Sequence, residues 1–204
     1  NTRMRCLWVF TCIFPLIVAE DAPRVTIRQG VLEGRYYTTR GGRSVFGFLG
    51  IPYAKSPEAE LRFKSPEPPE AWEGVRKAKS DGPPCVQQDV LDYKNRNKTF
   101  GKEDCLFLNV FTPTLNNSAN LPVIVFIHGG GFYEGSSHSR VYGPGYLLDK
   151  DVVLIAMNYR LGPLSFMSTE DEELPGNLGL KDQTQALRWV QENIHTFGGD
   201  KDSV

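Results

Sequence analysis

Residues 123–132 read Val123-Ile124-Val125-Phe126-Ile127-His128-Gly129-Gly130-Gly131-Phe132, an apolar run that ends in a histidine and three glycines. Apolar side chains at every position of a short run predict a strand buried on both faces, as in a parallel sheet. Glycine permits a sharp turn and leaves backbone N–H groups uncovered by side chains. The stretch therefore predicts a buried strand whose carboxyl end opens into a loop with uncovered N–H donors.

Further short strands and one helix are expected around this run. β-Branched and aromatic residues between glycines predict antiparallel strands at 25–27, 31–37 and 45–49. Proline-rich residues 52–84, with Trp72 as an anchor, predict an ordered surface loop. More strands are expected at 106–111, 122–127 and 152–158, and Ser203-Val204 resembles the beginning of another.

The helix is expected from residue 179 or 180 to about 195, where Gly198-Gly199 ends it. Helical spacing predicts that its apolar face is formed by Leu180, Thr184, Leu187, Val190 and Ile194. The alternation of strands and helix predicts an α/β fold with a mixed or parallel sheet.

Composition is that of an ordinary globular domain. The 204 residues are 40% hydrophobic and 23% charged, which suits one domain with a hydrophobic core. The formal net charge is -1 and the pI is about 6.4, so neither nucleic acid nor an acidic membrane surface is an expected partner. Because the sequence has neither the Cys and His spacing of a metal site nor a phosphate-binding glycine motif, no metal and no cofactor are expected.

The first residues have the layout of a secretory signal peptide. Met4-Arg5 begins a short positive region, residues 6–18 are almost wholly apolar, and Ala19 precedes Glu20-Asp21. We therefore expect a signal peptide at 4–19 and a secreted mature chain that occupies 20–204. The apolar stretch is too short for a membrane span, which needs about 20 residues. An N-terminal core strand is the alternative.

Secretion would place the cysteines that lie outside the signal peptide in an oxidising compartment. Cys85 and Cys105 form an even pair, so a disulfide is expected, and two unpaired thiols are the alternative. Asn97-Lys98-Thr99 and Asn116-Asn117-Ser118 are N-glycosylation sequons in polar stretches. Asn97 and Asn116 are therefore candidate glycosylation sites.

A His-Gly-Gly-Gly loop after a buried strand can supply the donors of an oxyanion hole, and a plain tight turn is the alternative. An oxyanion hole needs a nucleophile, but the G-x-S-x-G elbow that would provide it does not occur in the sequence. The nearest match, at 135–139, ends in Ser139 instead of glycine. His128 is expected to orient the loop, and His138 and His195 do not have the chain position of a catalytic histidine.

The block Glu103-Asp104-Cys105-Leu106-Phe107-Leu108-Asn109-Val110 is similar to the E-D-C-L-x-L-N-V signature of type-B carboxylesterases, the cholinesterase-like branch of the α/β-hydrolases. The resemblance covers residues 23–204. Other blocks match that family in the same order: Gly47-Phe48-Leu49-Gly50-Ile51-Pro52-Tyr53-Ala54, Leu61-Arg62-Phe63, His128-Gly129-Gly130-Gly131-Phe132, Asn158-Tyr159-Arg160-Leu161-Gly162, Gly176-Asn177-Leu178-Gly179-Leu180-Lys181-Asp182-Gln183 and Phe197-Gly198-Gly199-Asp200.

The resemblance implies the N-terminal part of an α/β-hydrolase fold, with a mixed, mostly parallel and incomplete central sheet. It implies that Gly130 and Gly131 are oxyanion-hole donors, and that Cys85 and Cys105 form the family's first disulfide loop. It also implies that Arg62 with Glu103, and Arg160 with Asp182, are structural ion pairs.

The resemblance also implies a small-molecule ester as substrate and a serine that forms an acyl-enzyme. The nucleophile elbow would follow about six residues beyond Val204, so the acid and the histidine are also outside the sequence. We therefore expect the 204 residues to be a fragment that is inactive by itself.

The sequence departs from the family pattern at two places. Ser165 stands where glycine is common, which concerns the local backbone. The loop from Cys85 to Cys105 contains Tyr93 and Phe100 but no tryptophan, and cholinesterases use a tryptophan there to bind the choline cation. The chain therefore looks more like secreted carboxylesterases of insects. A cholinesterase-like adhesion or binding protein without catalysis is the alternative, and the intact glycines favour the enzyme.

Overall fold

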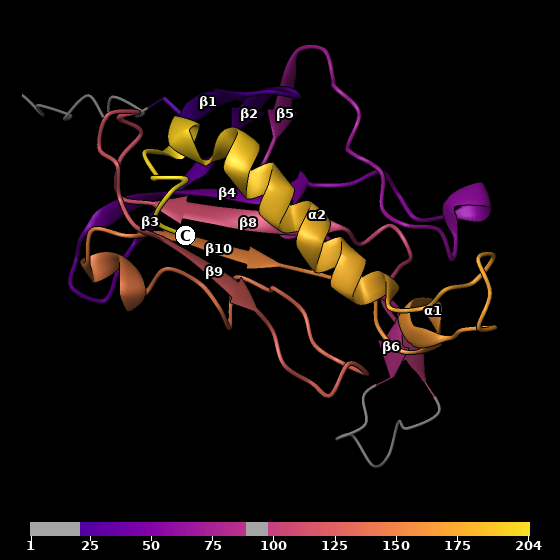
Figure 1. The fold of residues 1–204 in the computed structure, drawn as a ribbon. Helices are drawn as coiled ribbons and strands as arrows, with labels where there is room; N and C mark the ends of the chain where they lie inside the picture. The colour runs from indigo at the N-terminus through magenta and orange to yellow at the C-terminus, as the bar shows by residue number, and fades with distance from the viewer. Residues whose placement is uncertain (1–20, 89–97) are drawn as a thin grey trace, which may run out of the picture.

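The computed structural model describes residues 21–88 and 98–204. The expected signal peptide at 4–19 and the candidate glycosylation site Asn97 lie outside the described residues. Figure 1 shows the order of the elements along the chain. The strands are β1 (Arg24–Ile27), β2 (Gly30–Glu33), β3 (Arg35–Thr38), β4 (Ser44–Pro52), β5 (Val75–Lys77), β6 (Gln87–Gln88), β7 (Thr99–Phe100), β8 (Phe107–Thr112), β9 (Val123–Ile127) and β10 (Val153–Met157). The helices are α1 (Pro163–Phe166) and α2 (Leu178–Asn193), with short 3-10 turns at Ala59–Leu61, Leu147–Asp149 and Ile194–Phe197.

The central sheet has five strands in the order β3-β4-β8-β10-β9. It is mixed, as expected, but among its described strands only β9 and β10 are parallel. The expectation of a mostly parallel sheet is therefore wrong for this part of the chain. The reason is the connections: β3 and β4 form a tight hairpin, which only antiparallel strands allow, whereas a long crossover joins β9 to β10.

The segment expected as one strand at 31–37 is divided between two sheets. β2 pairs with β1 and β5 in a small separate sheet, whereas β3 pairs with β4. The division falls at Gly34, where an added Cβ would lie 2.6 Å from the carbonyl oxygen of Gly47 and 2.7 Å from the ring of Phe48. The absence of a side chain lets the backbone pass this close to the central sheet, and the chain changes sheets there.

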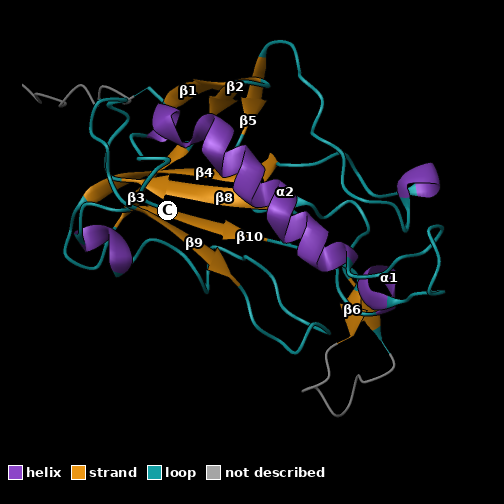
Figure 2. Ribbon diagram, in the orientation of Figure 1, coloured by secondary structure: helices purple, strands orange, loops and turns teal. Residues whose placement is uncertain are grey.

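Alternate residues of the central strands enter two hydrophobic clusters, one on each face of the sheet. Along β10, Val153, Ile155 and Met157 belong to one cluster and Leu154 to the other. The first cluster also contains Trp189 and Val190 of α2, and Figure 2 shows this helix lying across one face of the sheet. The second cluster contains Leu148 of the turn Leu147–Asp149. The period of two in the strands thus builds a core on both faces.

Helix α2 begins and ends close to the expected positions, and Gly198 with φ +76° follows the last turn. The expected apolar face is right for Val190 and Ile194, which are buried, and wrong for Leu180 and Leu187, which are 43% and 39% exposed, and for Thr184, which is also exposed. The buried face also contains Trp189 and several polar residues. These polar side chains find partners that are distant in sequence: Asp182 binds Arg160, Gln185 binds the carbonyl of Tyr53, and Asn193 binds the N–H of Arg28.

Strand β9 is less buried than its composition predicts. Ile124 and Ile127 are each 40% exposed, and β9 is an edge strand of the sheet among the described residues. The prediction that β9 is buried on both faces is therefore wrong among the described residues. Ser203-Val204 are not in a strand, although the carbonyl of Ser203 accepts the N–H of Val123 at 2.9 Å.

Candidate active site

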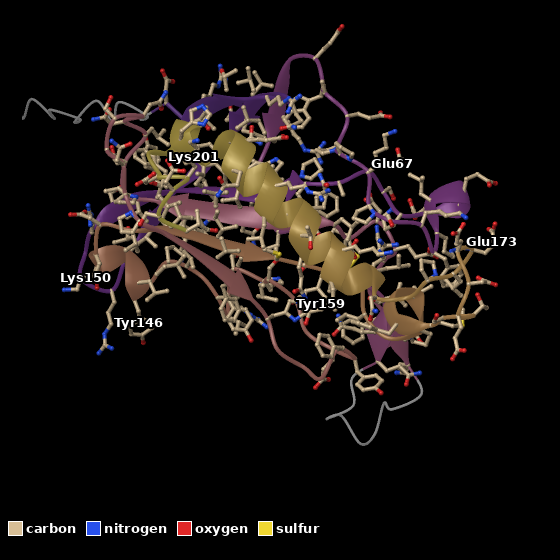
Figure 3. All side chains as sticks on the ribbon, in the orientation of Figure 1. Glu67, Tyr146, Lys150, Tyr159, Glu173 and Lys201 are labelled. Carbon is tan, nitrogen blue, oxygen red and sulfur yellow. A yellow bond between two sulfur atoms is a disulfide. The ribbon has the colours of Figure 1, made fainter. Side chains whose placement is uncertain are left out.

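The parallel pairing of β9 with β10 brings two loops to the same edge of the sheet. Ile127 lies opposite Met157, so both strands end together, β9 being followed by His128 and β10 by Asn158 and Tyr159. The hydroxyl of Tyr159 donates to the carbonyl of His128 at 2.8 Å, and the two rings stack with their centroids 4.4 Å apart. Figure 3 labels Tyr159 at this edge. The first residue of the glycine loop is therefore held from the neighbouring strand.

The glycine loop folds back on itself after His128. Gly130 has φ +116° and Gly131 has φ +59°, which glycine adopts without strain. The carbonyl of Gly130 accepts the N–H of Tyr133 at 3.0 Å and that of Glu134 at 3.2 Å. A Cβ on Gly130 would lie 1.9 Å from the carbonyl oxygen of Glu134, so this turn closes only with glycine at position 130.

The N–H groups of Gly130 and Gly131 donate to no acceptor within residues 21–88 and 98–204. Among the hydrogen bonds of the described residues, none is donated by either group, and both residues are exposed. Gly131 also lines a cavity. Neighbouring N–H groups that are directed away from other backbone acceptors can bind an anion or a developing oxyanion.

His128 is buried and neutral beside these glycines. Its ring Nδ1 lies 2.8 Å from the carbonyl oxygen of Gly129, and because a carbonyl only accepts, Nδ1 carries the proton. Burial lowers the pKa of His128 below its ordinary value, although the bond to Gly129 acts in the opposite direction. Nε2 has no partner among the described residues. The contacts of His128 are those of a residue that orients the loop.

The carboxyl end of the loop is fixed by a buried polar network. Asn158, which follows β10, accepts the N–H and the hydroxyl of Ser137 at 2.8 and 3.0 Å. Asn109 of β8 donates to the carbonyl of Ser137 at 2.9 Å and to Asp81 at 2.7 Å. The carboxylate of Asp81 accepts the N–H and the hydroxyl of Ser139. Side chains on one strand and on two loops therefore hold the segment that follows the glycines.

Gln87 of β6 holds the same segment from the disulfide loop. Its side-chain amide both donates to and accepts from the backbone of Gly135. The sequence patterns did not single out Gln87, Asp81, Asn109 or Asn158 as functional. Asn109 and Asn158 fall within blocks that match the family, which was the one signal that pointed to them.

Two cavities of about 440 and 410 Å³ lie beside the glycine loop, and Tyr133, Gly162 and Pro163 line both of them. None of the lining residues that the structure describes carries a charge. Cavities of this size that are mostly apolar suit an uncharged organic group. The remaining lining residues are Val86, Gln87, Gln88, Thr99, Leu161 and Leu164 in the larger cavity, and Gly131, Phe132, Phe166 and Met167 in the smaller.

The other predicted site residues lie around the loop or away from it. Cys85 and Cys105 form a disulfide. Arg160 and Asp182 form a two-point ion pair with side chains 5% and 0% exposed. Arg62 and Glu103 also form a two-point pair, but at the surface, with side chains 45% and 24% exposed.

Asn116 is exposed, and its side chain accepts the N–H of Ser118 in a turn. This geometry leaves the Asn116 sequon accessible.

No nucleophile pairs with a histidine in the described part of the chain. Ser139 is next to His138, but its hydroxyl donates to Asp81 at 2.7 Å and not to the imidazole. Residues 21–88 and 98–204 contain no cluster of three or more His, Cys, Asp or Glu side chains that could hold a metal ion. They also contain no helix whose length and apolar character would allow it to cross a bilayer.

Comparison with known proteins places these features in a family. The family model described as Carboxylesterase family matches residues 21–204. Juvenile hormone esterase of Tribolium castaneum is 47% identical over 182 residues, which are 89% of this chain and 31% of the relative. Esterase FE4 of Myzus persicae is 47% identical over 203 residues, which are 97% of this chain and 35% of the relative. The chain thus spans about a third of the length of these curated relatives.

A solved structure shows the same fold. Juvenile hormone esterase from Manduca sexta, with OTFP covalently attached, matches with a TM-score of 0.80 at 42% identity, over 88% of this chain and 34% of that chain. This neighbour identifies the mixed sheet and its helix as part of an α/β-hydrolase fold. The match of residues 21–204 and the likeness to insect esterases show that the chain belongs to the carboxylesterase family.

Proposed function

We propose that the protein to which these residues belong is a secreted serine carboxylesterase. The observation that carries the proposal is that the N–H groups of Gly130 and Gly131 have no acceptor among the described residues and lie beside cavities whose described lining residues are uncharged. The named relatives are esterases, which supports the same class of reaction.

The glycine N–H groups would act on the oxygen of the ester carbonyl. A serine attacks the carbonyl carbon as its hydroxyl proton passes to the catalytic histidine, and the electron pair of the C=O bond moves to the oxygen, which Gly130 and Gly131 bind. The alcohol then leaves with a proton from the general acid, and water hydrolyses the acyl-enzyme. Each donor that is directed at the oxyanion is typically worth about 3 kcal/mol in the transition state.

The serine, the acid and the catalytic histidine would come from residues that follow Val204, because the 204 residues contain no nucleophile elbow. We therefore propose that this chain alone does not hydrolyse esters. Turnover of a simple aryl ester by the purified 204-residue chain, lost on Gly131→Pro, would contradict this part of the proposal.

The test of the proposed function uses the full-length reading frame. We expect a serine in the elbow, hydrolysis of an aryl ester and stoichiometric labelling by an organophosphate. Another residue at the elbow, together with no turnover, would favour the non-catalytic binding protein.

A pair of alanine variants tests the oxyanion donors. In Gly130→Ala the Cβ would collide with the carbonyl of Glu134, whereas in Gly129→Ala it would meet nothing within 4 Å. We expect Gly130→Ala to lower kcat by about 100-fold or more and Gly129→Ala to have a much smaller effect. Equal loss in both variants would contradict the assignment of the donors.

Secretion and glycosylation are part of the proposal. They rest on the signal-peptide layout of 4–19 and on the exposed turn at Asn116. Expression in a secreting eukaryotic cell should release the protein into the medium. Removal of N-glycans should increase its electrophoretic mobility, and Asn116→Gln should reduce that shift.

A further inference from the structure

Gln87 makes a closed pair of hydrogen bonds with the backbone of Gly135. The N–H of Gly135 donates to Oε1 of Gln87 at 2.8 Å, and Nε2 of Gln87 donates to the carbonyl of Gly135 at 2.8 Å. Nε2 also donates to the carbonyl of Cys85 at 3.0 Å. The orientation of the side-chain amide is fixed, because an N–H must meet oxygen and a carbonyl must meet N–H. Gln87 is 7% exposed, so little bulk water competes for these bonds.

Gly135 packs closely against His128 and Gly129 at the start of the glycine loop. A Cβ on Gly135 would be 2.3 Å from Nδ1 of His128 and 2.6 Å from the carbonyl oxygen of Gly129. The backbone of Gly135 is therefore in close contact with the residues that precede Gly130. A displacement of Gly135 would move or release these residues, because packing this close cannot absorb a shift.

Gln87 itself is held close to a disulfide. Cys85, whose carbonyl Gln87 also binds, is joined to Cys105, which is buried just before β8. A continuous set of contacts thus leads from the disulfide through Gln87 to Gly135, and from there to His128 and Gly129.

We propose that Gln87 is a positioning residue for the oxyanion hole, and this rests on the proposed function of Gly130 and Gly131. Gln87 does not touch the reacting atoms through this amide. It fixes Gly135, and Gly135 fixes the backbone that aims the two N–H groups. The disulfide loop is therefore part of the catalytic geometry as well as a wall of the larger cavity.

The test compares two variants of Gln87 in the full-length protein. Gln87→Met keeps the length of the side chain and removes all three hydrogen bonds. Gln87→Glu keeps the acceptor for the N–H of Gly135 but directs a carboxylate oxygen at two carbonyl oxygens. Protonation of that carboxyl restores one donor, and desolvation between carbonyls raises its pKa.

We expect Gln87→Met to lower kcat by about 10- to 100-fold at every pH, with KM changed by less than about threefold. Gln87→Glu should show a similar loss of kcat at alkaline pH. As the pH is lowered, its kcat relative to the parent protein at the same pH should rise again in part. Binding of a trifluoromethyl ketone, which forms a tetrahedral oxyanion on the enzyme, should weaken in parallel with kcat/KM.

Gln185→Glu is the matched control. Gln185 is 6% exposed, is similarly buried, and binds the carbonyl of Tyr53 instead of the glycine loop. We expect its kcat and ketone affinity to stay within about threefold of the parent protein, even where its melting temperature falls.

Three results would overturn the proposal. They are a kcat of Gln87→Met within twofold of the parent, a loss confined to KM, or equal losses in Gln87→Met and Gln185→Glu. If both Gln87 variants fold poorly, the affinity of their folded fraction for the trifluoromethyl ketone replaces kcat as the test. An affinity equal to that of the parent protein would then overturn the proposal. Failure of the parent protein to hydrolyse any ester would instead overturn the proposed function.

Discussion

Tyr159 holds His128 in two ways at once: its ring stacks on the imidazole, with planes 16° from parallel, and its hydroxyl donates to the histidine carbonyl at 2.8 Å. The two residues follow neighbouring parallel strands, so the stack links the ends of β9 and β10. Both residues are almost fully buried. The glycine loop therefore begins from a fixed point, as the proposed oxyanion donors would require, because such donors should not reorganise during the reaction.

Removal of the Tyr159 hydroxyl should loosen this fixed point. Tyr159→Phe keeps the aromatic stack but leaves the buried carbonyl of His128 without this donor, and we expect a loss of about 1–3 kcal/mol in the free energy of unfolding. Chemical denaturation of the full-length protein would measure it. Tyr146→Phe is the control, since Tyr146 is 71% exposed and should change stability by less than about 0.5 kcal/mol. Equal effects of the two variants would show that the hydroxyl of Tyr159 contributes nothing.

Burial of His128 gives stability a pH dependence. The pKa of His128 is lowered in the folded protein, mainly by desolvation, from an ordinary value of 6.5. The unfolded chain therefore takes up a proton first as the pH falls, so stability is full above 6.5 and is lost between 6.5 and the lower folded pKa. Unfolding free energies measured from about pH 8 to about pH 5 should fall for the parent protein and fall less for His128→Gln. Parallel curves for the two proteins would contradict the buried neutral state of His128.

The two ion pairs should differ strongly in their contribution to stability. Asp182 is fully buried and binds the guanidinium and the N–H of Arg160. Asp182→Asn therefore leaves the buried positive charge of Arg160 without its negative partner. We expect a loss of roughly 3–5 kcal/mol. Glu103→Gln breaks the exposed pair with Arg62 and should cost less than about 1 kcal/mol. Denaturation midpoints of the two variants test this order, and a larger loss for Glu103→Gln would reverse it.

The strands were predictable because their signals are local. The runs that became β8, β9 and β10 are rich in β-branched and aromatic residues, and Gly198 ends the 3-10 turn that follows α2. The division of 31–37 at Gly34 was missed, because it depends on the approach of Gly47 from another strand. Contacts between residues that are distant in the chain leave no periodic signal in either segment.

The buried face of α2 and the surroundings of the glycine loop were not predictable for the same reason. Asp182, Gln185 and Asn193 are polar, so hydropathy assigns them to solvent, although each has a partner more than 20 residues away. Gln87 binds Gly135 across 48 residues of sequence. The glycines themselves were predicted, because a triple glycine after an apolar run is visible without any knowledge of contacts.

Ser165 has a structural use at the start of α2. It is fully buried in α1, and its Oγ accepts the N–H of Gly179 in the first turn of α2 at 2.6 Å. The N-cap residue Asn177 makes no side-chain capping bond, so Ser165 satisfies a helix donor from outside the helix. A Cβ on Gly179 would lie 2.4 Å from this Oγ, which shows how closely the two segments fit.

Ser165→Ala should therefore behave as the loss of a helix cap. We expect the free energy of unfolding to fall by about 1 kcal/mol, because one buried N–H at the start of α2 loses its acceptor. Thr184→Ala is the control on the same helix, since Thr184 is exposed and its hydroxyl bonds only the carbonyl of Leu180. Its effect should stay within about 0.5 kcal/mol. Chemical denaturation compares the two, and a loss in Ser165→Ala no larger than that in Thr184→Ala would show that the buried hydroxyl does not cap α2.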